Sequence, residues 1–215
     1  MTVQWFKRMG DIPGVRYDPP VAVDRSKLRG HDAVARVERY EFDGRITESL
    51  RWESADAGDD DFGGSGSPAH AIAFGGLDNE LATRTLLKRL WEGLELPGQA
   101  SDYHFAVQGV AGSLRSRRAR EPEVLKWVEY LCLLDIRLIQ ACPEAVTDDI
   151  ADLYARHRRF YSVLSFQSLI DLYTREGFLA EALDVACIAQ TFEQERAPVA
   201  ELEERLAALR AEDGD

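Results

Sequence analysis

Residues 173–183, with the sequence YTREGFLAEAL, follow the spacing Tyr-x3-Gly-x3-Glu-Ala-Leu and predict the fold of this chain better than any other stretch. Tyr173 is positioned to close a first helix, and Gly177 supplies the left-handed turn that a residue with a Cβ resists. Ala182 is small enough for a second helix to approach the first. The stretch therefore predicts a helical hairpin, which is a scaffold and by itself indicates no chemistry.

The composition is that of an acidic chain with enough apolar residues for a sizeable core. Of 215 residues 45% are hydrophobic, and 38 acidic against 26 basic side chains give a formal net charge of −12. Nucleic-acid binding needs clustered positive charge, so this balance argues against a nucleic-acid partner. Most of the basic residues are arginine, a bias that is typical of a GC-rich bacterial genome.

The sequence predicts a cytoplasmic protein without a membrane segment. Its cysteines, Cys132, Cys142 and Cys187, are odd in number and lack CxxC spacing, which favours free, reduced thiols. The first thirty residues do not have the apolar run and cleavage site of a signal peptide. The longest apolar stretch, Tyr130 to Ile139, is too short to cross a bilayer.

We expect three parts: an N-terminal arm with a β-hairpin over residues 1–53, a flexible linker over 54–69, and a helical domain over 70–215. The linker is indicated by three consecutive aspartates, 59–61, that run into glycines and serines. No Lys-Ser/Thr pair follows these glycines, so they do not form a phosphate-binding loop. The Gly-Ser run is equally consistent with a natural loop and with an engineered replacement.

Two interpretations of residues 35–53 remain open, and we favour a β-hairpin. Asp43-Gly44 suits a two-residue turn, and the residues after it alternate between apolar and polar. Such a turn places Arg39 opposite Glu48 and Val37 opposite Leu50. The alternative is a second helical hairpin, because Tyr40, Gly44 and Glu48 repeat the spacing of the later one. A further short strand is expected over Ala71 to Phe74.

After the linker the apolar residues recur at helical spacing. We expect one helix capped by Asp78 and ended by Pro97, and another started by Ser101 or Asp102. The next opens at Glu121 and is apolar nearly all round from Val124 to Ile139, which predicts the most buried helix. From about Asp148 two interpretations stay open, one helix that continues to Gly177 or two helices with a break between them. Further helices are expected from Phe178 to Phe192 and behind Pro198.

The segment from Phe166 to Ala189, within about residues 163–192, resembles one tetratricopeptide repeat. The residues at that family's spaced positions are Leu169, Tyr173, Gly177, Ala182, Ala186 and Ala189. The resemblance implies a packed helical hairpin and a role in binding a protein or peptide. The earlier match at Tyr40 lies out of register with the family's period of about 34 residues, so we do not expect a regular superhelix.

The side chains that could carry chemistry show no catalytic or ligating pattern. His31, His70, His104 and His157 are scattered, and none is spaced with another ligand along a helix face. We therefore expect no metal and no cofactor. His104, between two aromatic residues, is interpreted as structural, and paired aspartates at 148–149 are interpreted as a helix cap.

Two clusters of arginines stand out against the acidic background and are the candidate partner-binding residues. They comprise Arg115, Arg117 and Arg118 in the first cluster, next to Arg120, and Arg156, Arg158 and Arg159 in the second. Either cluster could hold an acidic partner. Alternatively, the first complements a helix C-terminus and the second is a solvated face that pairs with surplus acids.

These features lead to three hypotheses for function. The favoured one is a non-catalytic scaffold that binds a protein or peptide, since the hairpin is clear and catalytic spacing is missing. The second is an acidic immunity or antitoxin-like neutraliser of a basic effector, motivated by the net charge of −12. The third is an enzyme whose site the sequence does not reveal, which converging titratable residues with displaced pKa values would support.

Overall fold

The computed structural model describes residues 4–42, 45–54, 66–75, 81–147, 160–194 and 197–212. Within these ranges the chain forms a short two-stranded sheet and seven α-helices, joined by short 3-10 turns. The elements are β1 (Val34–Phe42), β2 (Arg45–Glu53), α1 (Pro68–Gly75), α2 (Thr83–Leu94), α3 (Ala100–Arg117), α4 (Leu125–Ala141), α6 (Leu164–Glu176), α7 (Leu179–Thr191) and α8 (Val199–Glu212).

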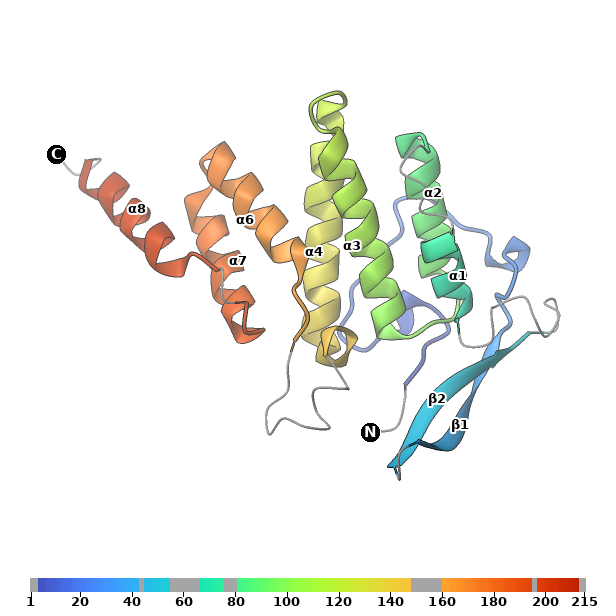
Figure 1. Ribbon diagram of the computed structural model, residues 1–215. Coiled ribbons are helices and arrows are strands. Elements are labelled where there is room, and N and C mark those ends of the chain that lie inside the picture. The colour runs from blue at the N-terminus through green and yellow to red at the C-terminus, as the bar shows by residue number, and fades with distance from the viewer. Residues whose placement is uncertain are drawn as a thin grey trace.

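The helices stand side by side in one row, and the sheet projects below one end of it (Figure 1). Helices α1 and α2 form one end of the row, α3 and α4 its middle, and α6, α7 and α8 continue it to the other end. The architecture is mainly helical with an N-terminal β-hairpin, which confirms the predicted fold class.

Helix α4 is the central element of the core, as its apolar circumference predicts. Its inward residues, among them Leu131, Leu138 and Ile139, are fully buried against α3 and α6. Burying one leucine of this kind contributes about 1.5–3 kcal/mol. The helix begins after the 3-10 turn Pro122–Val124 and ends at Cys142, because Pro143 cannot continue it.

Helices α6 and α7 form the hairpin that the sequence predicts. Gly177 lies just past α6 with φ of 84°, and the Phe178 N–H donates to the Tyr173 carbonyl at 2.8 Å. On α7 the small residues Ala182, Ala186 and Ala189 are buried, which lets the two helices pack closely. The membership of this hairpin in the tetratricopeptide family stays a prediction.

The N-terminal arm docks into the helical core. Phe6 pairs with Gly98 through two backbone hydrogen bonds of 2.9 and 3.0 Å, and Met9 and Ile12 are buried in the main core. Arg8 also reaches the buried carboxylate of Glu95 at 3.4 Å. The first part of the arm thus shares the main core with helical residues from Ala69 to Leu202, while Trp5, Ala33, Leu50 and Trp52 form a second, small cluster at the hairpin.

Strands β1 and β2 pair in the predicted register. Arg39 lies opposite Glu48 and Val37 opposite Leu50, which confirms the β-hairpin and rules out the helical alternative. Leu50 and Trp52 are buried on one face, where the Trp5 ring packs edge-on against Trp52 with centroids 5.6 Å apart. The turn residues at 43–44 lie outside the described residues.

Four local predictions need correction. The strand expected over Ala71–Phe74 is wrong, because these residues belong to helix α1. The Ser67 hydroxyl caps the first turn of this helix by accepting a hydrogen bond of 3.0 Å from the His70 N–H. The predicted linker range also ends too late, since α1 begins at Pro68 and Ala69 is buried.

The third correction concerns the start of α3. Gln99 caps this helix, and Asp102 lies at its third position, where its carboxylate accepts from the Gln99 N–H at 2.8 Å. The predicted cap at Ser101 or Asp102 is therefore two to three residues late.

The fourth correction concerns the start of α2: the predicted cap at Asp78 is wrong, because this helix begins at Thr83 with Ala82 at its N-cap. Residues 148–159 lie outside the described residues, but residues 160–163 are not helical, so α6 is a separate helix that begins at Leu164.

Candidate functional site

An apolar groove with a volume of about 850 Å³ lies between the arm, α2 and the start of α4. We call it the tryptophan groove. Two indole rings form its floor, those of Trp91 and Trp127, with centroids 6.1 Å apart. Its remaining apolar lining comes from Val21, Ala22, Val23, Leu28, Leu87 and Val124.

The arm and the helices position these side chains by ordinary packing. Trp91 is almost completely buried on α2, and the Tyr17 ring of the arm stacks on it at 6.3 Å. Val21 stands on the outer wall with 57% of its surface exposed. The groove is therefore lined by a partly buried Trp127 and an almost fully buried Trp91, and the Val21 side chain in its lining is open to solvent.

Charged residues form the rim of the tryptophan groove and largely pair with one another. Lys27 contacts Asp24 and Lys88 contacts Glu92, each at 2.8 Å. The rim has four basic and four acidic residues, namely Lys27, Arg84, Lys88 and Lys126 against Asp24, Glu92, Glu121 and Glu123, so its formal charges cancel. Recognition in this groove would rest on apolar contact more than on charge.

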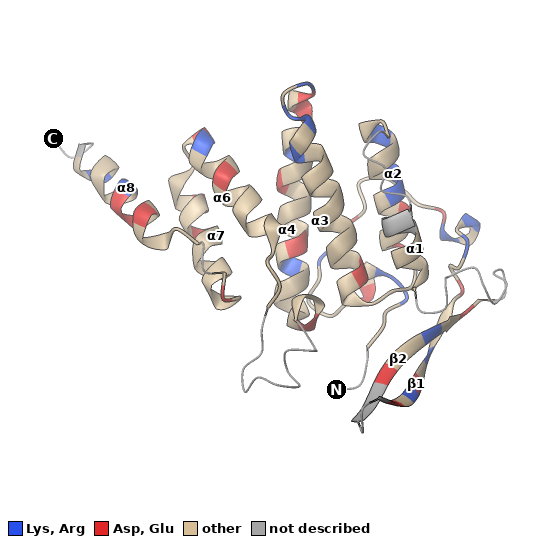
Figure 2. Ribbon diagram, viewed as in Figure 1, with Lys and Arg blue, Asp and Glu red and all other residues tan. Residues whose placement is uncertain are grey.

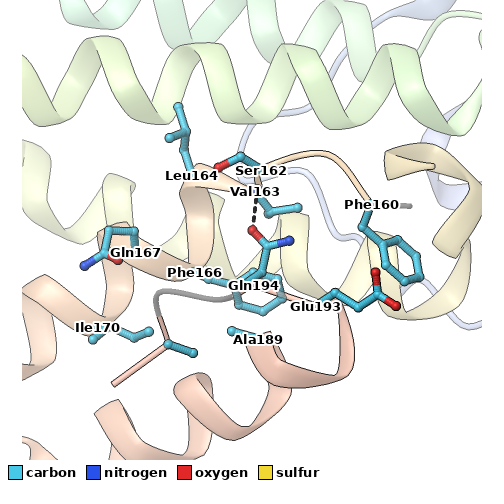
Figure 3. Close-up of a pocket in the computed structure, with 11 residues that line it drawn as sticks. Phe160, Ser162, Val163, Leu164, Phe166, Gln167, Ile170, Ala189, Glu193 and Gln194 are labelled. Atoms are coloured by element: carbon cyan, nitrogen blue, oxygen red, sulfur yellow. Dashed lines mark hydrogen bonds between the residues drawn. The ribbon is translucent and has the colours of Figure 1, made fainter. Parts of the chain in front are cut away.

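A second groove of about 500 Å³ lies where the segment before α6 meets the end of α7 (Figure 3). Gln194 closes one side of it: its Oε1 accepts from the Val163 N–H at 3.0 Å, and its Nε2 donates to the Phe192 carbonyl at 2.8 Å. Phe166 and Ile170 provide apolar lining, and Glu193 contributes a carboxylate. The hydrogen bonds of Gln194 join the segment before α6 to the end of α7. The lining of this second groove is less apolar than that of the tryptophan groove.

In the first predicted cluster the structure separates Arg117 from Arg115. Arg117 donates to the Leu81 carbonyl at 2.6 Å and to the Thr83 hydroxyl at 3.2 Å, so it ties the end of α3 to the start of α2. Arg115 turns the other way, to an ion pair with Asp171 and a hydrogen bond of 3.2 Å to Ser168 on α6. The contacts of both arginines join helices within the fold. They agree with the alternative interpretation, in which the first cluster belongs to a helix C-terminus.

Arg118 lines a small cavity of about 140 Å³ together with Arg115 and Arg175. Asp171 and Glu176 line the same cavity, so the positive charge is largely balanced there. The sequence did not single out Arg175, which lies 57 positions after Arg118. Arg156, Arg158 and Arg159 of the second predicted cluster lie outside the described residues.

Two clusters of aspartate, histidine and serine are tertiary features that the sequence did not indicate. In the first, Asp135 accepts from Ser165 at 2.5 Å and lies 2.7 Å from the His104 Nδ1. All three side chains come from different helices and are buried. Within the described part of the chain the His104 Nε2 has no hydrogen-bond partner.

The second cluster lies where α1 and α3 begin. Asp102 accepts from Ser67 at 2.6 Å and lies 3.4 Å from the His70 Nδ1, and the ring of His70 is half exposed. The hydrogen bond to Asp102 raises the pKa of His70, partly offset by burial.

Neither cluster has the arrangement of a nucleophilic triad. In both, aspartate stands between serine and histidine, and no hydrogen bond recorded among the described residues joins a serine hydroxyl to an imidazole that could take its proton. Burial, with Asp135 nearby, also raises the pKa of the Cys132 thiol to about 12, which keeps this thiol protonated and unreactive near neutral pH.

Two further features bear on the possible activities of the chain. In the ranges that the structure describes, no group of three or more His, Cys, Asp or Glu side chains could hold a metal ion. None of the described helices is long and apolar enough to cross a membrane.

The comparisons with known proteins give no further guidance. No protein-family model, no curated protein and no solved structure matches this chain. Its function must therefore be argued from its own geometry.

Proposed function

We propose that this chain is a non-catalytic helical scaffold of a bacterial cytoplasm that binds a protein or peptide segment in the tryptophan groove. The observation that carries the proposal is the groove itself, with two indole rings at its floor and an open apolar wall. The hairpin of α6 and α7, which resembles a tetratricopeptide repeat, is part of the framework that holds the row of helices together.

The dimensions of the groove suit a peptide with one or two bulky apolar side chains. A volume of about 850 Å³ lies within the range of ligand sites, roughly 300–1,000 Å³. Tryptophan is enriched among residues that dominate binding energy, because its large rigid surface is desolvated at little entropic cost. Trp91 and Trp127 are held by their neighbours before any ligand arrives, which further lowers that cost.

The balanced rim predicts the salt dependence of binding. The four basic and four acidic residues leave no net charge to attract or repel a partner. Peptides anchored by apolar contact should stay bound at about 0.5 M salt, where the Debye length is only a few Å.

A random peptide library displayed on phage and selected at about 0.5 M salt provides the probe. Three of the four lysines in the chain, Lys27, Lys88 and Lys126, line the tryptophan groove, and Lys7 does not. Amine labelling followed by mass spectrometry therefore reports occupancy. We expect a selected peptide to protect these three lysines and to leave Lys7 equally reactive, so that Lys7 serves as the internal control.

A matched pair of variants locates the site. Val21→Glu places a charge on the wall of the tryptophan groove, whereas Leu164→Glu changes an equally exposed residue at the other groove. We expect Val21→Glu to weaken the Kd of the selected peptides by at least about tenfold, which corresponds to about 1.4 kcal/mol, and Leu164→Glu to leave it unchanged. Failure to select any peptide, or loss of binding in Leu164→Glu alone, would refute the proposal.

The second candidate is an acidic neutraliser of a basic effector, favoured by the net charge of −12. Acidic and basic residues are interspersed along the helices drawn in Figure 2, and four of the acids, with no basic residue, lie within residues 55–65. A neutraliser would capture basic proteins that dissociate at about 0.5 M salt, the opposite of the salt-resistant binding expected above.

A further inference from the structure

The free edge of β1 offers a surface that no other described part of the chain pairs with. The hairpin projects from the row of helices, and each of its strands has nine residues (Figure 1). In the described parts of the chain β1 pairs with β2 and with no other segment. Every second residue of β1 therefore presents its N–H and C=O groups at an open edge, where another strand can add.

The side chains of β1 are unusually exposed for a strand with apolar residues. Val34, Val37 and Tyr40 have 53%, 43% and 50% of their surfaces exposed. An isolated two-stranded hairpin is marginally stable, and a sheet usually needs three or more strands or a packing partner. Trp5 covers part of one face, near Trp52, and leaves these three residues open.

We infer that a second copy of this chain pairs antiparallel with the edge of β1, with Val37 facing Val37 across a two-fold axis, to form a four-stranded sheet in the order β2-β1-β1-β2. An antiparallel pair related by such an axis uses the same surface on both copies, so one strand is sufficient for both sides of the interface. The helical row of each copy then lies at an opposite end of the shared sheet.

The sequence of β1 fits this register residue by residue. On one face Val34 comes opposite Tyr40 and Arg36 opposite Glu38, and on the other Val37 comes opposite itself. All three exposed apolar side chains thereby gain apolar partners, and the charged pair is complementary. Cross-strand pairs of both kinds stabilise a sheet.

Neighbouring two-fold registers are less favourable. Moving the axis to Glu38 places two carboxylates opposite each other, and moving it to Arg36 or Arg39 does the same with two guanidinium groups. Like charges directly opposite destabilise a sheet. Among the axes that pass through residues 36–39, only the one at Val37 avoids such a pair.

Mass in solution tests the inference. We expect light scattering over a concentration series to show a species of twice the chain mass of 24.2 kDa, and Val37→Lys to return it to 24.2 kDa by placing two ammonium groups on the axis. Leu209→Lys changes a residue of similar exposure on α8 and should leave the dimer intact. A wild-type monomer at all concentrations, or a dimer unaffected by Val37→Lys, would overturn the inference.

Crosslinking tests the register without relying on a disruptive change. In a Cys187→Ser background, which removes the exposed thiol, Val37→Cys should be joined to its copy by a short bis-maleimide. Tyr40→Cys should not be, because the two positions lie six residues apart along the paired strands, roughly 20 Å. Crosslinking at position 40 and not at position 37 would contradict the proposed register, as would equal crosslinking at both.

Discussion

The two aspartate clusters use the same three residue types in opposite settings. Asp135 binds Ser165 and His104 where α3, α4 and α6 meet, with no surface open to solvent. Asp102 binds Ser67 and His70 at the beginnings of α1 and α3, where water reaches the imidazole. Because the residue types are the same, we expect the difference in burial to make the first cluster contribute more to stability than the second.

The largest effect is expected at the buried cluster. Asp135→Ala leaves the Ser165 hydroxyl and the His104 ring without their acceptor in the interior, and each unsatisfied buried group costs about 1–3 kcal/mol. We expect the free energy of unfolding in urea to fall by about 3 kcal/mol or more. Ser165→Ala, which removes one donor, should cost distinctly less. A loss below about 1 kcal/mol for Asp135→Ala would show that water enters the cluster.

The next largest loss of unfolding free energy is expected at Gly98, whose backbone packs beside the half-exposed cluster. A Cβ on Gly98 would lie 2.7 Å from the Ala69 Cβ and 3.3 Å from the Asp102 carboxylate. Overpacking of this kind costs about 1–3 kcal/mol, so Gly98→Ala should lower the unfolding free energy by that amount. The matched control is Gly112→Ala, which meets no atom within 4 Å in helix α3 and should stabilise by up to about 1 kcal/mol.

Removing the serine of the half-exposed cluster should have a smaller effect. Ser67 caps α1 by accepting from the His70 N–H and donates to Asp102. Loss of an N-cap costs about 0.5–2 kcal/mol, and water can replace part of the lost contact here. Ser67→Ala should therefore destabilise the protein less than Asp135→Ala. A larger loss of unfolding free energy for Ser67→Ala than for Asp135→Ala would contradict the expectation that the buried cluster contributes more to stability.

The smallest effect is a pH dependence at His70. Its pKa in the folded state is raised above 6.5 by the hydrogen bond to Asp102, so its charged form stabilises the fold. This contribution is complete below about pH 6.5 and is lost as the pH rises through the folded-state pKa. Melting temperatures of wild type and His70→Gln should differ more at pH 5.5 than at pH 8.5. Equal differences at both values would show that the contact with Asp102 is not an ion pair.

Local patterns in the sequence were sufficient to predict the elements that depend on neighbouring residues. The β-hairpin register follows from the two-residue turn and from the alternation of the residues after it. Gly177 marks the end of α6 because its left-handed conformation depends on the local sequence and not on distant contacts. The core position of α4 follows from its apolar circumference. Helix α1 was misread because a run of small apolar residues has no period that separates helix from strand.

The candidate sites depend on contacts between distant residues and were not predicted. Asp135 lies 31 positions from His104 and 30 from Ser165, and no spacing rule connects them. The tryptophan groove needs the arm to lie beside α2, which no local pattern in the sequence indicates. The arginines 115, 117 and 118 were predicted as a cluster; the structure turns Arg117 toward α2 and leaves Arg115 and Arg118 lining one cavity.

The docking of the arm constrains the order in which the molecule assembles. The Tyr103 hydroxyl contacts the Phe6 carbonyl across 97 residues of sequence, and the Tyr130 hydroxyl contacts the Asp18 carbonyl across 112. During synthesis Met9 and Ile12 emerge long before the helices that bury them, so they remain exposed until most of the chain has left the ribosome. Closing a loop of about 100 residues costs about 4 kcal/mol of chain entropy, which makes docking of the arm a late event that follows collapse of the helices.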